Sequence, residues 1–301
     1  MRSLLRSSIL FAGITIAAAA HATPSTTYWA PSTTYVQPYG VPHLTYDTYF
    51  WKGAGKNYPI DTGITIGVLP WEKLQLEVGY DLFLPSQNPL LFLLNAKLGT
   101  PENTFFNGSP SLAAGIFGVG IKGKSSSDLG TSYDILYGQV QKNLPWGGYL
   151  SAGGYYGAGT KDLWVSSDDH KEHRAGFMGA LASPDVNVNL PGLKKLLVVA
   201  DVQTGKNLYG AAGGGVYFYF NDFIDVLTGP VYFFDGASQP GGANWMWTVQ
   251  LDVDIPLKAT PPAAAPAGPP EPPATQPAVP PAAPAPPVER AAPAPVNPST
   301  P

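Results

Sequence analysis

One stretch restricts the possible folds of this sequence more than any other, residues 245–255. Its odd-numbered residues, from Trp245 to Ile255, are all large and apolar, whereas polar residues occupy most even positions. Successive side chains of a β-strand point to opposite faces, so this stretch predicts a strand with one apolar and one polar face. Such a strand borders a soluble core if its apolar face points inward, and a membrane if that face points outward into lipid.

Eleven further stretches have the composition or the alternation of strands. The alternation is clearest in residues 73–84, where leucine, valine and tyrosine alternate with charged residues, glutamine and glycine. An even number of strands, each of about ten residues, is what a bacterial outer-membrane barrel requires. The predicted strands are 43–50, 59–69, 73–84, 90–98, 111–121, 131–141, 148–158, 172–181, 194–203, 208–220, 223–234 and 243–255.

A soluble sandwich or barrel would show the same alternation with its faces exchanged. The polar faces are rich in glycine, serine and threonine, and charged residues make up 13% of the chain, about half the share of an average soluble protein. Aromatic residues gather near strand ends, where interfacial girdles lie. We therefore predict an all-β fold, a transmembrane antiparallel β-barrel of about 12 strands. The girdle candidates are Trp71, Trp146, Tyr149, Trp164, Phe220, Phe223, Phe233, Phe234 and Trp245.

The N-terminus has the pattern of an export signal, residues 1–22. Arg2 and Arg6 precede an apolar run, 9–20, that is too short to span a bilayer, and small residues follow at the cleavage positions. A retained anchor helix is the alternative. Residues 23–42 form an extended leader with a repeated Pro-Ser-Thr-Thr-Tyr motif. We expect this leader to be a disordered lead-in; the alternative places it against the barrel mouth or in the lumen.

The C-terminal residues, 258–301, are rich in proline and alanine and cannot build a core. They predict a disordered tail with polyproline II character. Two interpretations stay open, a minor extension and a spacer that reaches peptidoglycan or a periplasmic protein. The predicted folded domain is thus the outer-membrane barrel of residues 43–257.

The connections predict an orientation. If both termini are periplasmic, the periplasmic turns include 143–147 and 182–193, and the outer loops include 159–171 and 235–242. Pro230, which follows Gly229 inside a strand, cannot donate to the ladder and predicts a bulge there.

Three runs resemble uncharacterised bacterial outer-membrane β-barrel proteins, residues 67–81, 95–102 and 247–254. The resemblance spans about residues 43–257. It implies the fold and a place in the bacterial outer membrane, and it carries no established activity. The sequence departs from that pattern at its end, because outer-membrane barrels commonly finish on a terminal aromatic residue, whereas here the chain continues past Leu257 into the tail.

Little in the sequence points to chemistry. The chain has no cysteine and a net charge of −4, which excludes disulfides and thiol nucleophiles and gives no reason to expect a nucleic-acid partner. The run Asp168 to His173 holds acidic residues and two histidines, but alternating charge on a solvated loop is far commoner than a metal or catalytic site. We predict no catalytic residue, no metal and no cofactor.

Charged residues on the polar faces point to the lumen. Opposed charges inside a small barrel either brace it as salt bridges or line a narrow channel whose acidic excess favours cations. We expect a porin-like channel for ions or small solutes, embedded in outer-membrane lipid. The alternatives are a closed barrel that anchors the envelope through its tail, and an outer-membrane hydrolase or surface receptor. The lumen-lining candidates are Glu77, Asp81, Lys97, Asp134, Arg174, Asp201 and Asp252.

Overall fold

The computed structural model describes residues 25–52, 58–84, 92–120 and 132–257. The chain divides into two compact units, residues 1–259 and 260–301, and all described residues belong to the first. The predicted signal peptide and proline-rich tail lie outside the described residues. No helix among the described residues is long and apolar enough to cross a lipid bilayer.

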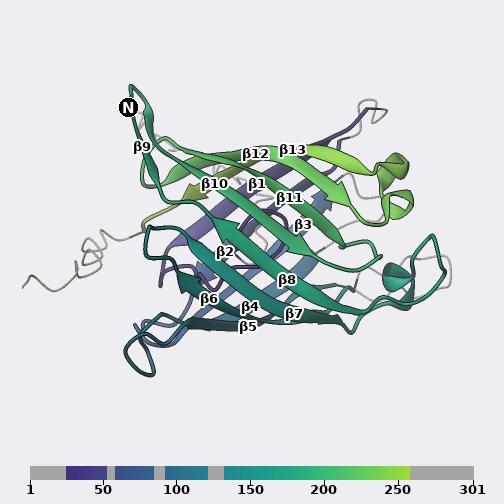
Figure 1. Ribbon diagram of the computed structural model, residues 1–301, viewed down its shortest axis with the longest axis horizontal. Coiled ribbons are helices and arrows are strands. Elements are labelled where there is room, and N and C mark those ends of the chain that lie inside the picture. Colours follow the sequence, from purple (N-terminus) through teal and green to yellow (C-terminus); the bar gives the residue numbers. More distant parts are fainter. Residues whose placement is uncertain (1–24, 53–57, 85–91, 121–131, 258–301) are drawn as a thin grey trace, which may run out of the picture. The chain divides into compact units, whose positions relative to one another are not determined.

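The described strands form one antiparallel sheet that closes on itself (Figure 1). Strands that follow one another in the chain pair around the barrel, except that β8 pairs with β10, and β1 pairs with β13 to complete the ring. Each of the twelve predicted strands is present, so the predicted fold class is confirmed. The strands are β1 (Pro42–Phe50), β2 (Ile60–Gly67), β3 (Gln75–Leu84), β4 (Phe92–Thr100), β5 (Ser111–Val119), β6 (Ile135–Asn143), β7 (Tyr149–Gly157), β8 (Ala175–Ala182), β9 (Val186–Leu190), β10 (Leu193–Gln203), β11 (Ala211–Tyr219), β12 (Ile224–Phe233) and β13 (Trp245–Asp254).

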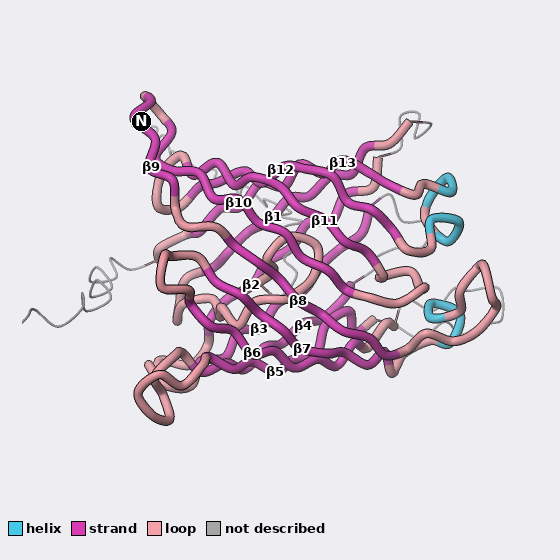
Figure 2. Tube along the Cα trace, viewed as in Figure 1, coloured by secondary structure: helices cyan, strands magenta, loops and turns pink. Residues whose placement is uncertain are grey.

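The barrel has two distinct ends. We call the end at which β1 begins and β13 ends the terminal end, and the opposite end the loop end. Three short 3₁₀ helices, η1 (Lys161–Trp164), η2 (Gly236–Ser238) and η3 (Pro240–Gly242), lie in the connections of the loop end, on the right of Figure 2. Which end faces the periplasm stays a prediction.

Strand β9 is the one described strand that the sequence did not predict. It pairs with the beginning of β10 and not with a second strand, and it projects beyond the barrel at the upper left of Figure 1. The segment 182–193 is therefore not only a turn, because it forms half of a hairpin that extends the wall at the terminal end.

The exposure of the side chains shows which face of the sheet points outward. In β13, Trp247, Val249 and Leu251 point outward and are at least 36% exposed, whereas Thr248 and Gln250 point inward and are at most 4% exposed. The same arrangement recurs around the barrel, with apolar residues outside and buried polar residues inside. A soluble fold would have these faces exchanged, so the exterior is that of a transmembrane β-barrel.

The aromatic residues near strand ends divide into two groups. Trp71, Trp146, Phe220, Phe223 and Trp245 are exposed on the outside, as expected of interfacial girdles. The assignment of Trp164, Phe233 and Tyr149 to a girdle is wrong. Trp164 and Phe233 are at most 2% exposed and belong to the aromatic core inside the barrel, and the Tyr149 hydroxyl bonds to Thr27 in the lumen. Position near a strand end does not reveal which face a side chain occupies.

The predicted bulge at Pro230 is also wrong. The register between β11 and β12 is the same on both sides of this residue, since Gly213 pairs with Val231 and Val216 pairs with Thr228. The ladder is interrupted without an inserted residue, as expected where proline lacks an N–H group. Pro230 still pairs with Trp247 of β13 on its other side.

Candidate functional site

The interior of the barrel contains the chain's own N-terminal segment. We call residues 25–37 the lumen segment; they contact β3, β4, β5, β6, β10, β12 and β13 from inside. Twelve of these thirteen residues are buried or half-buried, and Tyr35 is exposed. The expectation of a disordered lead-in is therefore wrong for these residues, and the alternative position in the lumen is correct.

Asp201 of β10 binds the middle of the lumen segment, residues 28–32, which we call its tip. Its carboxylate accepts hydrogen bonds from the backbone N–H groups of Tyr28, Trp29 and Ala30 at 2.9–3.1 Å, and from the hydroxyl of Ser32 at 2.9 Å. Three consecutive N–H groups that converge on one carboxylate form an anion-binding nest. The charge of Asp201, which is 5% exposed, is thus compensated by the lumen segment itself.

Glu77 and Lys97 bind the two ends of the lumen segment, Ser25 and residues 35–37. They lie opposite each other on β3 and β4, and their charged groups are 3.4 Å apart with no solvent exposure of either residue. Glu77 accepts hydrogen bonds from Ser25 and from the backbone N–H of Gln37. Lys97 donates to the carbonyl groups of Ser25 and Tyr35. This ion pair therefore binds both ends of the lumen segment, because the chain turns back so that Ser25 and residues 35–37 lie at the same place in the barrel.

Tyr28 packs the tip of the lumen segment against a part of the barrel wall that consists of glycine. Its ring lies on the inner surface of Gly213 and Gly215 of β11, where an added Cβ would come within 2.4 and 2.8 Å of the ring. Its hydroxyl donates to the carbonyl group of Pro230 at 3.1 Å. The run Gly213-Gly214-Gly215 was predicted either to admit close packing or to leave room in the lumen; at its two inward positions it admits close packing.

Replacing Gly213 with alanine should displace the Tyr28 ring and loosen the lumen segment. Overpacking of this kind costs on the order of 1–3 kcal/mol, and we expect the loss as faster proteolysis at 25–37 in the folded barrel. Gly138→Ala is the control, because its Cβ would meet nothing closer than 3.9 Å. Equal proteolysis of the two variants would show that the Tyr28 seat does not hold the segment.

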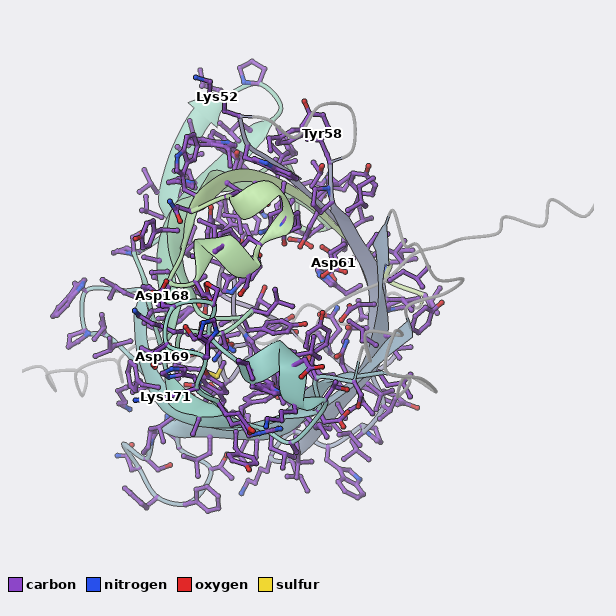
Figure 3. The ribbon with its side chains drawn as sticks, turned by 90° about the vertical axis from the view of Figure 1, so that its right-hand side faces the viewer. Lys52, Tyr58, Asp61, Asp168, Asp169 and Lys171 are labelled. Carbon is purple, nitrogen blue, oxygen red and sulfur yellow. The ribbon has the colours of Figure 1, made fainter. Side chains whose placement is uncertain are left out.

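A row of carboxylates lies beside the lumen segment on neighbouring strands. Asp47 of β1, Asp61 of β2 and Asp81 of β3 are at most 6% exposed, and all three line a cavity of about 40 Å³ against Thr26, Tyr28 and Trp29. Asn95 donates to one oxygen of Asp81 at 2.6 Å. Within the described residues, Oδ1 of Asp61 and Oδ1 of Asp81 have no hydrogen-bond partner. In Figure 3, viewed from the loop end, Asp61 lies on the inner wall.

The terminal end of the lumen opens into a second, larger space of about 430 Å³. It is also acidic: His43 of β1 contacts Asp252 and Asp254 of β13 at 3.2 and 3.0 Å, and Asp225 lies opposite Asp252 in the ladder. Thr26 and Asp47 line both this space and the small cavity. The two spaces are therefore neighbours along the inner wall.

The loop end contains a third space, of about 390 Å³, with a different lining. Most of its lining side chains are aromatic or apolar, and Trp29, Tyr49 and Tyr209 separate it from the small cavity, which they also line. The three spaces thus follow one another along the barrel. The lining of the loop-end space consists of Trp29, Tyr49, Pro59, Tyr133, Leu208, Tyr209, Phe233, Ser238, Gln239, Pro240 and Met246.

The connection 158–174 folds back over the loop end. Trp164 is fully buried and stacks on Tyr209 with ring centroids 6.4 Å apart. Asp235 ties this connection to η2, because it accepts hydrogen bonds from Ser167 and Ser238. Burial disfavours the charged form of Asp235, but these hydrogen bonds outweigh burial and hold its pKa below the ordinary value of aspartate.

The charged run in this connection forms exposed polar contacts. His173 contacts Asp169 at 3.1 Å, and Lys206 contacts Asp168 at 2.8 Å. Labels in Figure 3 place Asp168, Asp169 and Lys171 together on the rim. Among the described residues, no group of three or more histidine, aspartate or glutamate side chains is arranged to hold a metal ion.

The predicted lumen residues fall into three groups. Glu77, Lys97 and Asp201 hold the lumen segment, and Asp81 and Asp252 line the spaces beside it. The other two candidates lie at the loop end. Asp134 precedes β6 and accepts a hydrogen bond from Ser132, and Arg174 precedes β8 and donates to the carbonyl groups of Gly157 and Gly159.

Sequence reasoning missed Asp47, Asp61 and Asp225. Their signal was present in the printed sequence, because each occupies the polar phase of its strand, next to outward residues such as Tyr46, Ile60 and Ile224. Strand pairing was needed to find that Asp61 and Asp81 converge on one cavity.

Comparison with protein families finds no family that matches the sequence, and comparison with curated proteins finds no match either. Among solved structures, the chain is similar to an outer membrane channel from Pseudomonas putida F1. The two share 12% sequence identity with a TM-score of 0.38, and the similarity covers 78% of this chain and 100% of that chain.

Proposed function

We propose that this protein is a narrow, cation-favouring channel of the bacterial outer membrane, with the lumen segment as its internal restriction. The apolar exterior supports the membrane location. The observation that carries the proposal is the row of inward carboxylates along one wall, from Asp61 and Asp81 through Asp47 to Asp252.

This arrangement has the electrostatics of a cation path. Rings or rows of aspartate in a low-dielectric wall attract cations and repel anions. The buried cation of Lys97 offsets little of this field, because Glu77 lies 3.4 Å from it. The cavity of about 40 Å³ between the two larger spaces is the smallest of the three and admits about one water-sized particle. Selectivity should therefore be set beside Asp47, Asp61 and Asp81.

Neutralising Asp81 should weaken the selectivity of the channel. For the full chain in a planar bilayer under a KCl gradient, we expect the reversal potential of Asp81→Asn to move toward zero and its K⁺ conductance to fall by several-fold. Asp222→Asn is the matched control, because Asp222 is 73% exposed in a turn of the terminal end. The control should retain both the wild-type potential and conductance.

Two results would contradict the proposal. The first is a folded, heat-modifiable sample that conducts no current, which would favour a closed barrel. The second is an identical reversal potential for wild type, Asp81→Asn and Asp222→Asn, which would place the selectivity elsewhere.

A further inference from the structure

We infer that the loop-end space and the carboxylate cavity beneath it together form a binding site for a small primary ammonium compound with an apolar, ring-sized body. The inference rests on the proposed function and deepens it, since it names a class of ligand that binds in the same path. It rests on the juxtaposition of an aromatic chamber with two buried carboxylate oxygens that lack partners in the described structure.

The carboxylate cavity fits the ammonium group. Asp61 and Asp81 are 3% and 2% exposed, and each presents an oxygen with no hydrogen-bond partner among the described residues. A buried unpaired carboxylate oxygen is costly, and an ammonium group, with three N–H donors, would satisfy it. The cavity of about 40 Å³ has room for such a head group but not for a ring.

Aromatic rings form the boundary between the two spaces. Trp29, Tyr49 and Tyr209 line both, and the rings of Trp29 and Tyr49 pack in a T-shaped arrangement with centroids 5.8 Å apart. Aromatic faces attract cations by about 0.5–2 kcal/mol each, depending on desolvation. A cation that passes this boundary therefore exchanges water for aromatic faces before it reaches Asp61.

The loop-end space fits the apolar body. Its volume of about 390 Å³ lies in the range of small-molecule sites. Phe233 and Met246 are at most 2% exposed and form part of its wall. The rings are held in place before any ligand arrives: Phe233 packs edge-on against Trp29 at 5.2 Å, and the indole N–H of Trp29 donates to the carbonyl group of Tyr209 at 2.9 Å. A preformed apolar wall lowers the ordering cost of binding.

The charge pattern excludes the other small-molecule classes. An anion of the same shape would meet the carboxylates of Asp47, Asp61 and Asp81, and a neutral alcohol, with one O–H donor and no charge, would satisfy at most one of the two unpaired oxygens. Leaving such groups unpaired is the strongest source of discrimination against an analogue of similar size. The site should therefore prefer the ammonium compound over both.

The test compares 2-phenylethylammonium with two matched compounds, neutral 2-phenylethanol and anionic 3-phenylpropionate. Binding to the full, folded chain in detergent is measured by calorimetry, and block of K⁺ current is measured in bilayers with each compound added on either side. We expect 2-phenylethylammonium alone to bind and to block. Asp61→Asn should weaken its binding by about tenfold or more, and Asp222→Asn should leave binding unchanged; Asp81→Asn replaces Asp61→Asn if the latter does not fold.

The outcomes separate this inference from the proposed function. Specific binding of 2-phenylethylammonium by a folded protein that conducts no K⁺ would support the site and overturn the channel. K⁺ current with no binding of the ammonium compound, or with equal binding of 2-phenylethanol, would retain the channel and overturn the site. Binding that is unaffected by both Asp61→Asn and Asp81→Asn would also overturn it.

Discussion

Removal of residues 25–37 should raise the single-channel conductance by about tenfold. The smallest of the three spaces along the lumen has a volume of about 40 Å³, with Thr26, Tyr28 and Trp29 in its lining. Without those residues the lumen of a twelve-stranded barrel is limited only by its inward side chains, and such barrels lie between filled and open sizes. Planar-bilayer recordings of the deletion variant beside the full chain would measure the change.

A point substitution should loosen the lumen segment without deleting it. Asp201→Ala removes the acceptor for three backbone N–H groups and the Ser32 hydroxyl, so the tip should leave its position and the conductance should become larger and noisier. Asp222→Asn again serves as the control for a charge change away from the lumen. Conductance that is the same in the deletion variant, in Asp201→Ala and in the wild type would mean that the lumen segment does not restrict the path.

Breaking the ion pair inside the barrel should have the largest effect on stability. Glu77→Gln leaves the ammonium group of Lys97 fully buried beside a neutral partner. Removal of one member of a buried pair typically costs about 3–5 kcal/mol. We expect this loss in the free energy of unfolding, measured by urea titration in detergent with the shift of heat-modifiable migration as the readout.

Two comparisons make the stability prediction specific. The exposed pair of Lys206 and Asp168 has a shorter distance, 2.8 Å, yet Asp168→Asn should cost far less stability than Glu77→Gln because solvent screens both charges. The double variant Glu77→Gln/Lys97→Met should lose less than the sum of the single variants, since no uncompensated charge remains. Equal losses for Glu77→Gln and Asp168→Asn would show that the buried pair has no special role.

The fold was predictable because its signal is local. Each of the twelve barrel strands carries its own alternation or strand-like composition, as in 73–84 and 245–255, and an even set of such strands has few ways to pair. The exception is β9, whose five residues are too few to distinguish a strand from a turn. Its partner, the start of β10, identifies it only in three dimensions.

The candidate site was only partly predictable because its contacts are not local. The alternation along their strands placed Glu77, Lys97 and Asp201 inside the barrel. Their main partners, however, lie in residues 25–37, which do not show the alternation of a strand. A repeat of proline, serine, threonine and tyrosine is typical of an unstructured chain. It becomes ordered here because the barrel supplies carboxylates for its free N–H groups.

The contacts of Tyr28 have a consequence for how the molecule is made. Its partners Pro230 and Gln250 follow it by 202 and 222 residues in the chain, separations among the longest that hydrogen bonds span in the described residues. Contacts of such high order form late, because the intervening chain must first be ordered. The lumen segment, although it precedes every strand in the chain, should therefore take its position last. It can do so only after β12 and β13 are in place and His43 of β1 contacts Asp252 and Asp254 of β13. A newly closed barrel would therefore pass through a stage with a wider lumen before the lumen segment takes its position.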